Sequence, residues 1–146
     1  MNAELSPAAS PLLSQLRSLL GQESVVTDAT ECRFHSTDIY GEGKLPLAVL
    51  RPTSTADVSQ IVQLAANSGV AVVPRGGGAS YTDGYAPAEA GSLVIDFLND
   101  KETTEIYTRD MYAVVQVGVT WARLNEALQA QGLRSPFYGP FSGLAA

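Results

Sequence analysis

Three consecutive glycines, Gly76–Gly78, lie between Arg75 and the hydroxyl-bearing Ser80 in the segment VPRGGGASYTDG. A segment with so little side-chain bulk lets successive backbone N–H groups point into one concavity and approach an anion closely. A plain turn needs no such run, because each glycine costs about 1 kcal/mol of folding free energy relative to alanine. The pattern therefore favours a phosphate-binding loop over a simple turn.

Two common phosphate loops match this segment poorly: the P-loop fails, and the dinucleotide fingerprint matches only weakly. A P-loop carries a lysine after its last glycine, and residues 73–84 contain none. The dinucleotide fingerprint Gly-x-Gly-x-x-Gly, begun at Gly76, needs a glycine where Tyr81 stands. The next residues, TDGYAPAEAG, are also a poor helix because they contain Pro87 and two glycines.

Other chemically reactive residues are few. His35 is the only histidine and Cys32 the only cysteine, and no His, Cys or carboxylate cluster has the spacing of a metal site. We expect a packing or surface role for His35 instead of a role as a base, and an inert buried thiol at Cys32. Asp96 lies in an apolar segment, where we expect it to hydrogen-bond to the backbone.

Length and composition predict one soluble domain. The chain has 146 residues, 45% of them hydrophobic, and a mean hydropathy of +0.05. Its net charge of −6 argues against non-specific nucleic-acid binding, which relies on clustered Lys and Arg. With only one cysteine, the chain cannot form an intramolecular disulfide. Glu4 stands where a signal peptide carries positive charge. No apolar run reaches the roughly 20 residues of a membrane span. We expect a cytoplasmic protein without a membrane span.

A strand–helix–strand pattern leads into the glycine loop. It consists of an apolar strand at 47–52, a helix at 54–69 and a strand at 70–74. Ser54 is a natural N-cap, and Asp57 completes a capping box. The helix is expected to bury Val58, Ile61, Val62 and Ala65. The short links predict a parallel strand pair with a right-handed crossover, and the second strand is expected to be buried on both faces.

The flanking sequence predicts an α+β fold: a small βαβ unit, then antiparallel strands, with helices packed outside. A helix at 12–20 ends at Gly21, a short strand follows at 24–28, and 29–45 has no clear period and is expected to be a loop with a turn of helix. After the glycine loop we expect a strand at 91–97, a hairpin turning at Arg109–Asp110, and a helix at 120–132. Thr120 caps this helix, and Leu124, Ala127 and Leu128 face inward.

The segment PRGGGAS and the residues LRPTSTADVSQIVQLAANSGVAVV before it resemble the FAD-binding (PCMH-type) domain of the vanillyl-alcohol oxidase and p-cresol methylhydroxylase family of FAD-linked oxidoreductases. The resemblance continues through LVIDFLNDKETTEIYTRDMYAVVQVGVTWARLNEALQAQGL. FHSTDIYG is similar to the family's Tyr-Ser-Thr-Asp segment, with His35 in place of the tyrosine. The match covers about residues 33–146.

The resemblance implies a set of cofactor-binding residues that wrap the FAD pyrophosphate with main-chain N–H groups and hydroxyls. They are Pro74, Arg75, Gly76, Gly77, Gly78, Ala79, Ser80 and Tyr81 in the first loop, and Pro140, Ser142 and Gly143 in a second loop. Arg75 either neutralises phosphate charge or pins the loop, and we favour pinning. Tyr81 either stacks near the cofactor or packs in the core. Ala79 stands where several members carry a histidine bonded to the flavin, so non-covalent FAD is expected.

The resemblance implies an FAD-linked oxidase or dehydrogenase that oxidises an alcohol, hydroxy acid or phenol by hydride transfer to flavin. In this family the catalytic residues lie mostly in a later cap domain, so no residue of this chain is assigned a catalytic role. We expect a flexible N-terminus at 1–11 and an FAD-binding domain at 12–146 that lacks its C-terminal part, binds FAD weakly and does not turn over by itself. One alternative is a non-catalytic flavin- or nucleotide-binding module completed by a partner chain, which predicts oligomerisation that buries Phe137, Tyr138 and Phe141. Another is a structural domain that binds no ligand.

Overall fold

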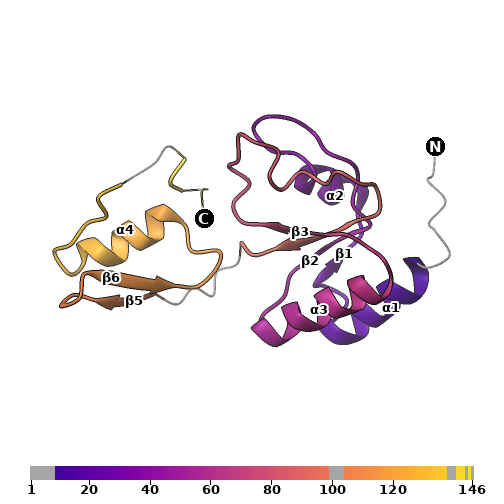
Figure 1. The fold of residues 1–146 in the computed structure, drawn as a ribbon, viewed down its shortest axis with the longest axis horizontal. Helices are drawn as coiled ribbons and strands as arrows, with labels where there is room; N and C mark the ends of the chain where they lie inside the picture. Colours follow the sequence, from indigo (N-terminus) through magenta and orange to yellow (C-terminus); the bar gives the residue numbers. More distant parts are fainter. Residues whose placement is uncertain (1–8, 99–103, 138–140, 144, 146) are drawn as a thin grey trace. The chain divides into compact units, whose positions relative to one another are not determined.

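The computed structural model describes residues 9–98, 104–137, 141–143 and 145. The chain divides into two compact units (Figure 1). The first unit comprises Met1–Arg75 and Ser80–Asp96, and the second comprises Gly76–Ala79 and Phe97–Ala146. Helices occur together with a mixed sheet and an antiparallel pair, which confirms the predicted α+β fold.

The first unit is built on a four-stranded sheet with the order β1-β2-β4-β3. β4 (Leu93–Asp96) lies in the middle, parallel to both β2 (Ala48–Leu50) and β3 (Val72–Arg75), and all four of its residues are buried. β1 (Val25–Val26) pairs antiparallel with β2. The two strands of the βαβ unit are thus parallel but not adjacent. β3 is a half-buried edge strand, so the prediction that it is buried on both faces was wrong.

Helices cover both faces of this sheet (Figure 1). α1 (Ala9–Leu20) and α3 (Thr55–Asn67) pack together on one face, and α2 (Ala29–His35) lies on the other. α1 begins three residues before the predicted helix at 12–20, and its residues Leu12, Leu13 and Leu16 are buried. Gly21 ends α1 with φ +87°, a left-handed conformation that glycine adopts without strain.

α2 is longer than the single turn of helix that was predicted within the loop 29–45. Its seven residues make only two turns, too few for a recognisable apolar period. The helix begins at an N-cap, Asp28, whose carboxylate accepts hydrogen bonds from the amides of Thr30 and Glu31. Cys32 packs against Val49 and Val94 of the sheet, and this burial raises the pKa of its thiol. The predicted inert character of Cys32 fits this position.

α3 begins as predicted, with the Ser54 hydroxyl accepting a hydrogen bond from the Asp57 amide at 3.1 Å. The Asp57 carboxylate reaches one residue further back than a capping box would place it and accepts from the Thr53 amide at 2.9 Å. Ile61 and Ala65 are buried, but Val62 is 46% exposed, so its predicted place in the buried face was wrong.

The second unit combines a hairpin with one helix. β5 (Thr104–Tyr107) pairs antiparallel with β6 (Tyr112–Val115), and the chain turns through 108–111, as predicted. α4 (Trp121–Gln129) packs on β5. Thr120 caps it by accepting a hydrogen bond from the Arg123 amide, which confirms the predicted N-cap. The residues predicted to face inward, Leu124, Ala127 and Leu128, are half-buried.

The helices of the described residues are short or polar for a membrane span. None of them has both the length and the apolar character required to cross a bilayer.

We predict that Asp57→Asn destabilises the first unit at neutral pH and that the difference disappears in acid. The Thr53 amide is the main cause that lowers the pKa of the Asp57 carboxyl in the folded state. A lowered folded-state pKa adds stability above the unfolded value of about 4, and that stability is lost as the pH falls through the folded-state pKa. Urea denaturation at pH 7 and in acid measures the effect, with the exposed Glu23→Gln as control. An equal loss at both pH values contradicts the assignment.

Candidate cofactor-binding site

The glycine loop follows the last residue of β3. Gly77 and Gly78 are buried, and Gly78 has φ +77°, a conformation that a side-chain-bearing residue adopts only with strain. Pro74, just before the loop, is exposed on the edge strand. A bare, sharply bent backbone at the carboxyl end of a parallel strand is where an α/β sheet binds phosphate groups. The main chain of this loop is therefore the candidate for binding the pyrophosphate of a dinucleotide.

Arg75 is turned into the protein. Its guanidinium is buried, and Nη1 donates to the backbone oxygen of Thr37 at 2.8 Å and to that of His35 at 3.4 Å. The ring of Tyr85 lies 4.8 Å from the guanidinium carbon and that of Phe34 5.7 Å, both within cation–π distance. Burial lowers the pKa of the guanidinium, although the group stays protonated. This geometry supports the favoured pinning role.

The three parallel strands share a pattern that explains this arrangement. Each places a valine under α2 and, two positions later on the same face, a charged residue at its carboxyl end. The pairs are Val49 with Arg51, Val73 with Arg75, and Val94 with Asp96. Arg75 and Asp96 are also register partners across β3 and β4. The carboxyl ends of the strands thus present two cations and one anion to α2: Arg51 contacts Glu31 in its first turn, and Asp96 and Arg75 contact its C-terminal end.

A polar cluster forms where these residues meet α2; His35 and Asp96 are buried in it, whereas the Arg51 side chain is 46% exposed. His35 Nε2 lies 3.3 Å from Asp96 Oδ2, and its Nδ1 lies 2.9 Å from the backbone oxygen of Glu31. Arg51 Nε lies 3.4 Å from the same Asp96 oxygen. His35 is therefore a packed, hydrogen-bonded residue, as expected. Asp96 contacts the side chains of His35, in α2, and of Arg51, just after β2, and its predicted hydrogen bond to the backbone stays a prediction.

The far end of the glycine loop is held by side chains. The Ser80 amide donates to the hydroxyl of Tyr85, and the Ser80 hydroxyl accepts from the Thr82 amide at 3.1 Å. Tyr81 is 54% exposed, which excludes the core-packing alternative and leaves the stacking role as a prediction. Tyr85 was not among the predicted residues. Its only signal in the sequence is its place in a turn-rich segment after the loop.

The second predicted loop lies against α4. The amides of Trp121 and Ala122 donate to the carbonyls of Ala145 and Ser142 at 3.0 and 2.8 Å. The first turn of α4 is thus hydrogen-bonded to this tail. Ser142 is buried and Gly143 exposed, while Pro140 lies outside the described residues.

The predicted residues fall in both compact units. Gly76–Ala79 belong to the same unit as Ser142 and Gly143, whereas Pro74, Arg75, Ser80 and Tyr81 belong to the first unit. Among the described residues, no group of three or more His, Cys, Asp or Glu is placed to hold a metal ion.

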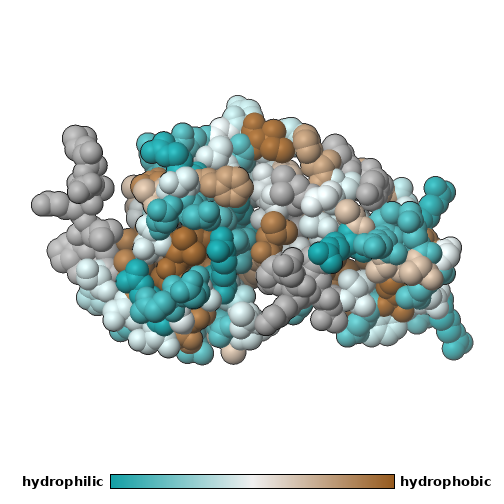
Figure 2. Space-filling view, turned by 180° about the vertical axis from the view of Figure 1, so that it is seen from behind, coloured by the Kyte–Doolittle hydropathy of each residue, from teal (hydrophilic) through white to brown (hydrophobic). Residues whose placement is uncertain are grey.

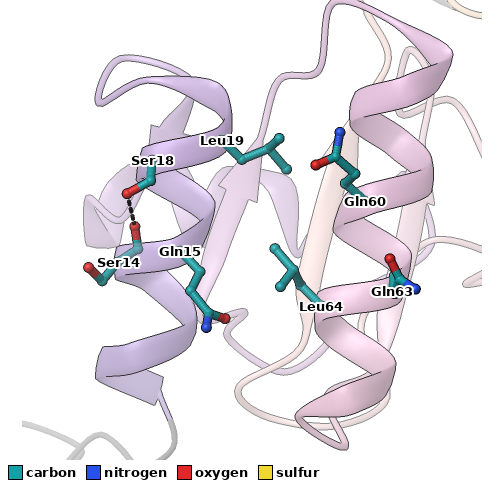
Figure 3. Close-up of a pocket in the computed structure, with 7 residues that line it drawn as sticks. All are labelled: Ser14, Gln15, Ser18, Leu19, Gln60, Gln63 and Leu64. Atoms are coloured by element: carbon teal, nitrogen blue, oxygen red, sulfur yellow. Dashed lines mark hydrogen bonds between the residues drawn. The ribbon is translucent and has the colours of Figure 1, made fainter.

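A hollow in the first unit competes with the loop as a binding site. It is a groove of about 450 Å³ between α1 and α3, within the first unit (Figure 3). Its described lining residues are all uncharged: Ser14, Gln15, Ser18, Leu19, Gln60, Gln63 and Leu64. It contains none of the predicted residues and no group suited to neutralise a phosphate. The glycine loop therefore remains the candidate site.

Residues 46–143, more than half of the chain, match the model of the FAD binding domain family. The chain belongs to this family, and its cofactor is FAD. The matched range contains the glycine loop and ends at Gly143 of the second loop.

Individual relatives agree with this assignment. The chain is 30% identical over 139 residues to the mitochondrial cytochrome D-lactate dehydrogenase of Arabidopsis thaliana, covering 93% of this chain and 24% of that protein. It is 34% identical over 96 residues to the glycolate oxidase subunit GlcD of Bacillus subtilis. This match covers 66% of this chain and 20% of that protein. The crystal structure of p-cresol methylhydroxylase with bound substrate has the same fold, with a TM-score of 0.84 at 19% identity. This match covers 98% of this chain and 29% of that chain. The chain thus spans about a quarter of the length of these proteins.

We predict that Gly118→Ala destabilises the second unit strongly. Gly118 has φ +98°, and a Cβ there would lie 2.0 Å from the backbone oxygen of Phe97, so the main chain itself must shift. The expected cost is at least about 3 kcal/mol, combining backbone strain with the clash.

The control is Gly132→Ala, because Gly132 also has a positive φ, +71°, but meets no atom within 4 Å. Its cost should stay near 1 kcal/mol, the strain of a left-handed alanine. Urea denaturation followed by tryptophan fluorescence reports on this unit through Trp121. Equal losses for the two variants contradict the close approach of Gly118 to Phe97.

Proposed function

We propose that this chain holds the ADP half of FAD in an FAD-linked oxidoreductase that oxidises an alcohol, hydroxy acid or phenol. The supporting observation is the bare loop at the end of β3, in which Gly78 has a left-handed backbone. The two curated relatives described above are named for lactate and glycolate, both 2-hydroxy acids. A hydroxy acid is therefore the favoured substrate class within this proposal.

In this proposal the protein binds and orients, and bound FAD supplies the ring that accepts the hydride. The amides of Gly76–Ala79 donate to the pyrophosphate oxygens, supported by the Ser80 and Ser142 hydroxyls. Glycine lets the backbone approach the phosphates without steric cost. Ala79 has no nucleophilic side chain, so the FAD is held without a covalent bond at this position.

A second candidate is a non-catalytic flavin- or nucleotide-binding module completed by a partner chain or by self-association. Phe137 and Phe141 support it, because they are 60% and 51% exposed; Tyr138 lies outside the described residues. On the face shown in Figure 2, apolar residues are scattered in small groups among hydrophilic ones.

The cellular location follows from sequence features only. A cytoplasmic location stays a prediction, supported by the single, buried cysteine. The Arabidopsis relative is named as mitochondrial.

Replacing a glycine in the loop tests the proposal. We predict that Gly78→Ala weakens FAD binding at least ten-fold, because it strains the backbone and places a methyl group in the phosphate cradle. Gly69→Ala is the matched control: Gly69 also has a left-handed backbone, φ +64°, but ends α3 in open space. Both variants should lose about 1 kcal/mol of stability.

Titration of FAD fluorescence measures the affinity of the 146-residue chain and both variants. Unchanged affinity in Gly78→Ala, or an equal loss in Gly69→Ala, contradicts the proposed loop. Absence of FAD binding by the parent chain contradicts the proposed function itself.

A further inference from the structure

Tyr85 connects the two ends of the glycine loop. Its hydroxyl accepts a hydrogen bond from the amide of Ser80, just after the loop. Its ring lies 4.8 Å from the guanidinium carbon of Arg75, just before the loop. One side chain thus contacts both residues that flank Gly76–Ala79.

The segment that carries Tyr85 is itself fixed. The amide of Lys44 donates to the backbone oxygen of Pro87 at 2.7 Å, and Pro87 is buried. Gly43 lies so close to this segment that a Cβ would meet Pro87 backbone atoms at 2.7 Å. The amide of Ala86 closes a turn onto the Asp83 carbonyl at 3.2 Å. Tyr85 therefore projects from a supported segment.

Arg75 is fixed on its other side by α2. Its Nη1 donates to the carbonyls of Thr37 and His35, and the ring of His35 is in turn held by Asp96. These bonds use the guanidinium inside the protein, where it is buried. A guanidinium held in this way cannot turn to a phosphate without breaking buried hydrogen bonds, which is costly.

We propose that Arg75, Tyr85 and Ser80 form a bracket that closes the base of the glycine loop and holds it ready for the pyrophosphate of FAD. The inference rests on the proposed function, adds Tyr85 as a positioning residue and joins it to the pinning role of Arg75. Three consecutive glycines have many conformations open to them, and ordering them on binding costs affinity. A bracket that restricts the loop beforehand reduces this cost.

Two conservative variants separate positioning from direct phosphate contact. Tyr85→Phe keeps the ring over Arg75 and removes only the acceptor for the Ser80 amide. Arg75→Lys keeps the positive charge. It loses the planar guanidinium, which lies over the ring of Tyr85 and donates to the carbonyls of His35 and Thr37. Tyr112→Phe is the control, because Tyr112 is exposed and its ring stacks on Tyr107 at 4.6 Å, so this variant also removes a hydroxyl and keeps a stacked ring.

FAD affinity is measured by fluorescence titration, and the order parameters of the Gly76–Ser80 amides are measured by 15N relaxation without FAD. We expect Tyr85→Phe to weaken FAD binding about five-fold, the effect of one lost hydrogen bond. Arg75→Lys should weaken it about ten-fold or more, and both variants should lower the order parameters of the loop. Tyr112→Phe should match the parent chain in both measurements.

Parent-like affinity in Arg75→Lys means that charge alone matters and overturns the positioning role. Unchanged order parameters in Tyr85→Phe and Arg75→Lys overturn the bracket, whether or not the chain binds FAD. If the parent chain fails to bind FAD but the order parameters fall as expected, the bracket stands and the proposed function fails. Thermal unfolding of each variant checks that the fold is retained.

Discussion

A guanidinium group removed from water must find its hydrogen-bond acceptors inside the protein, and Arg75 finds them at the end of α2. Most of the candidate site depends on this contact. It ties the last residue of β3 to a helix from a distant part of the chain, and it leaves the next four residues, Gly76–Ala79, to form the loop. The same group supports the ring of Tyr85, which contacts the far end of the loop.

The contact depends on simple alternation along the strands. A residue two positions after a valine that packs under α2 lies on the same face, so Arg75 and Asp96 both point to that helix. Asp96 then lies beside His35 and Arg51 in a mixed-charge cluster. Buried charges remain tolerable there because each has an opposite charge or a backbone acceptor within reach. A strand end buried in this way can carry a bare glycine loop without becoming disordered.

The parts that the sequence predicts are those with local signals. Ser54 and Thr120 are short polar residues before apolar periods, and both cap helices. The glycine run after an apolar strand located the loop. Contacts between distant residues had no such signal: His35 and Asp96 are 61 positions apart, and β4 enters the sheet between β2 and β3. The length of α2 was underestimated because a short helix has no clear apolar period, and Tyr85 was missed because nothing in its neighbourhood marks it as a partner of Arg75.

Amide hydrogen exchange of the 146-residue chain, with and without saturating FAD, tests the central claim that the glycine loop holds the cofactor. The account predicts that FAD slows exchange at Gly76–Ala79 and leaves the residues that line the groove between α1 and α3 unchanged. Bound FAD without slower exchange at Gly76–Ala79, or with slower exchange only along that groove, would contradict it.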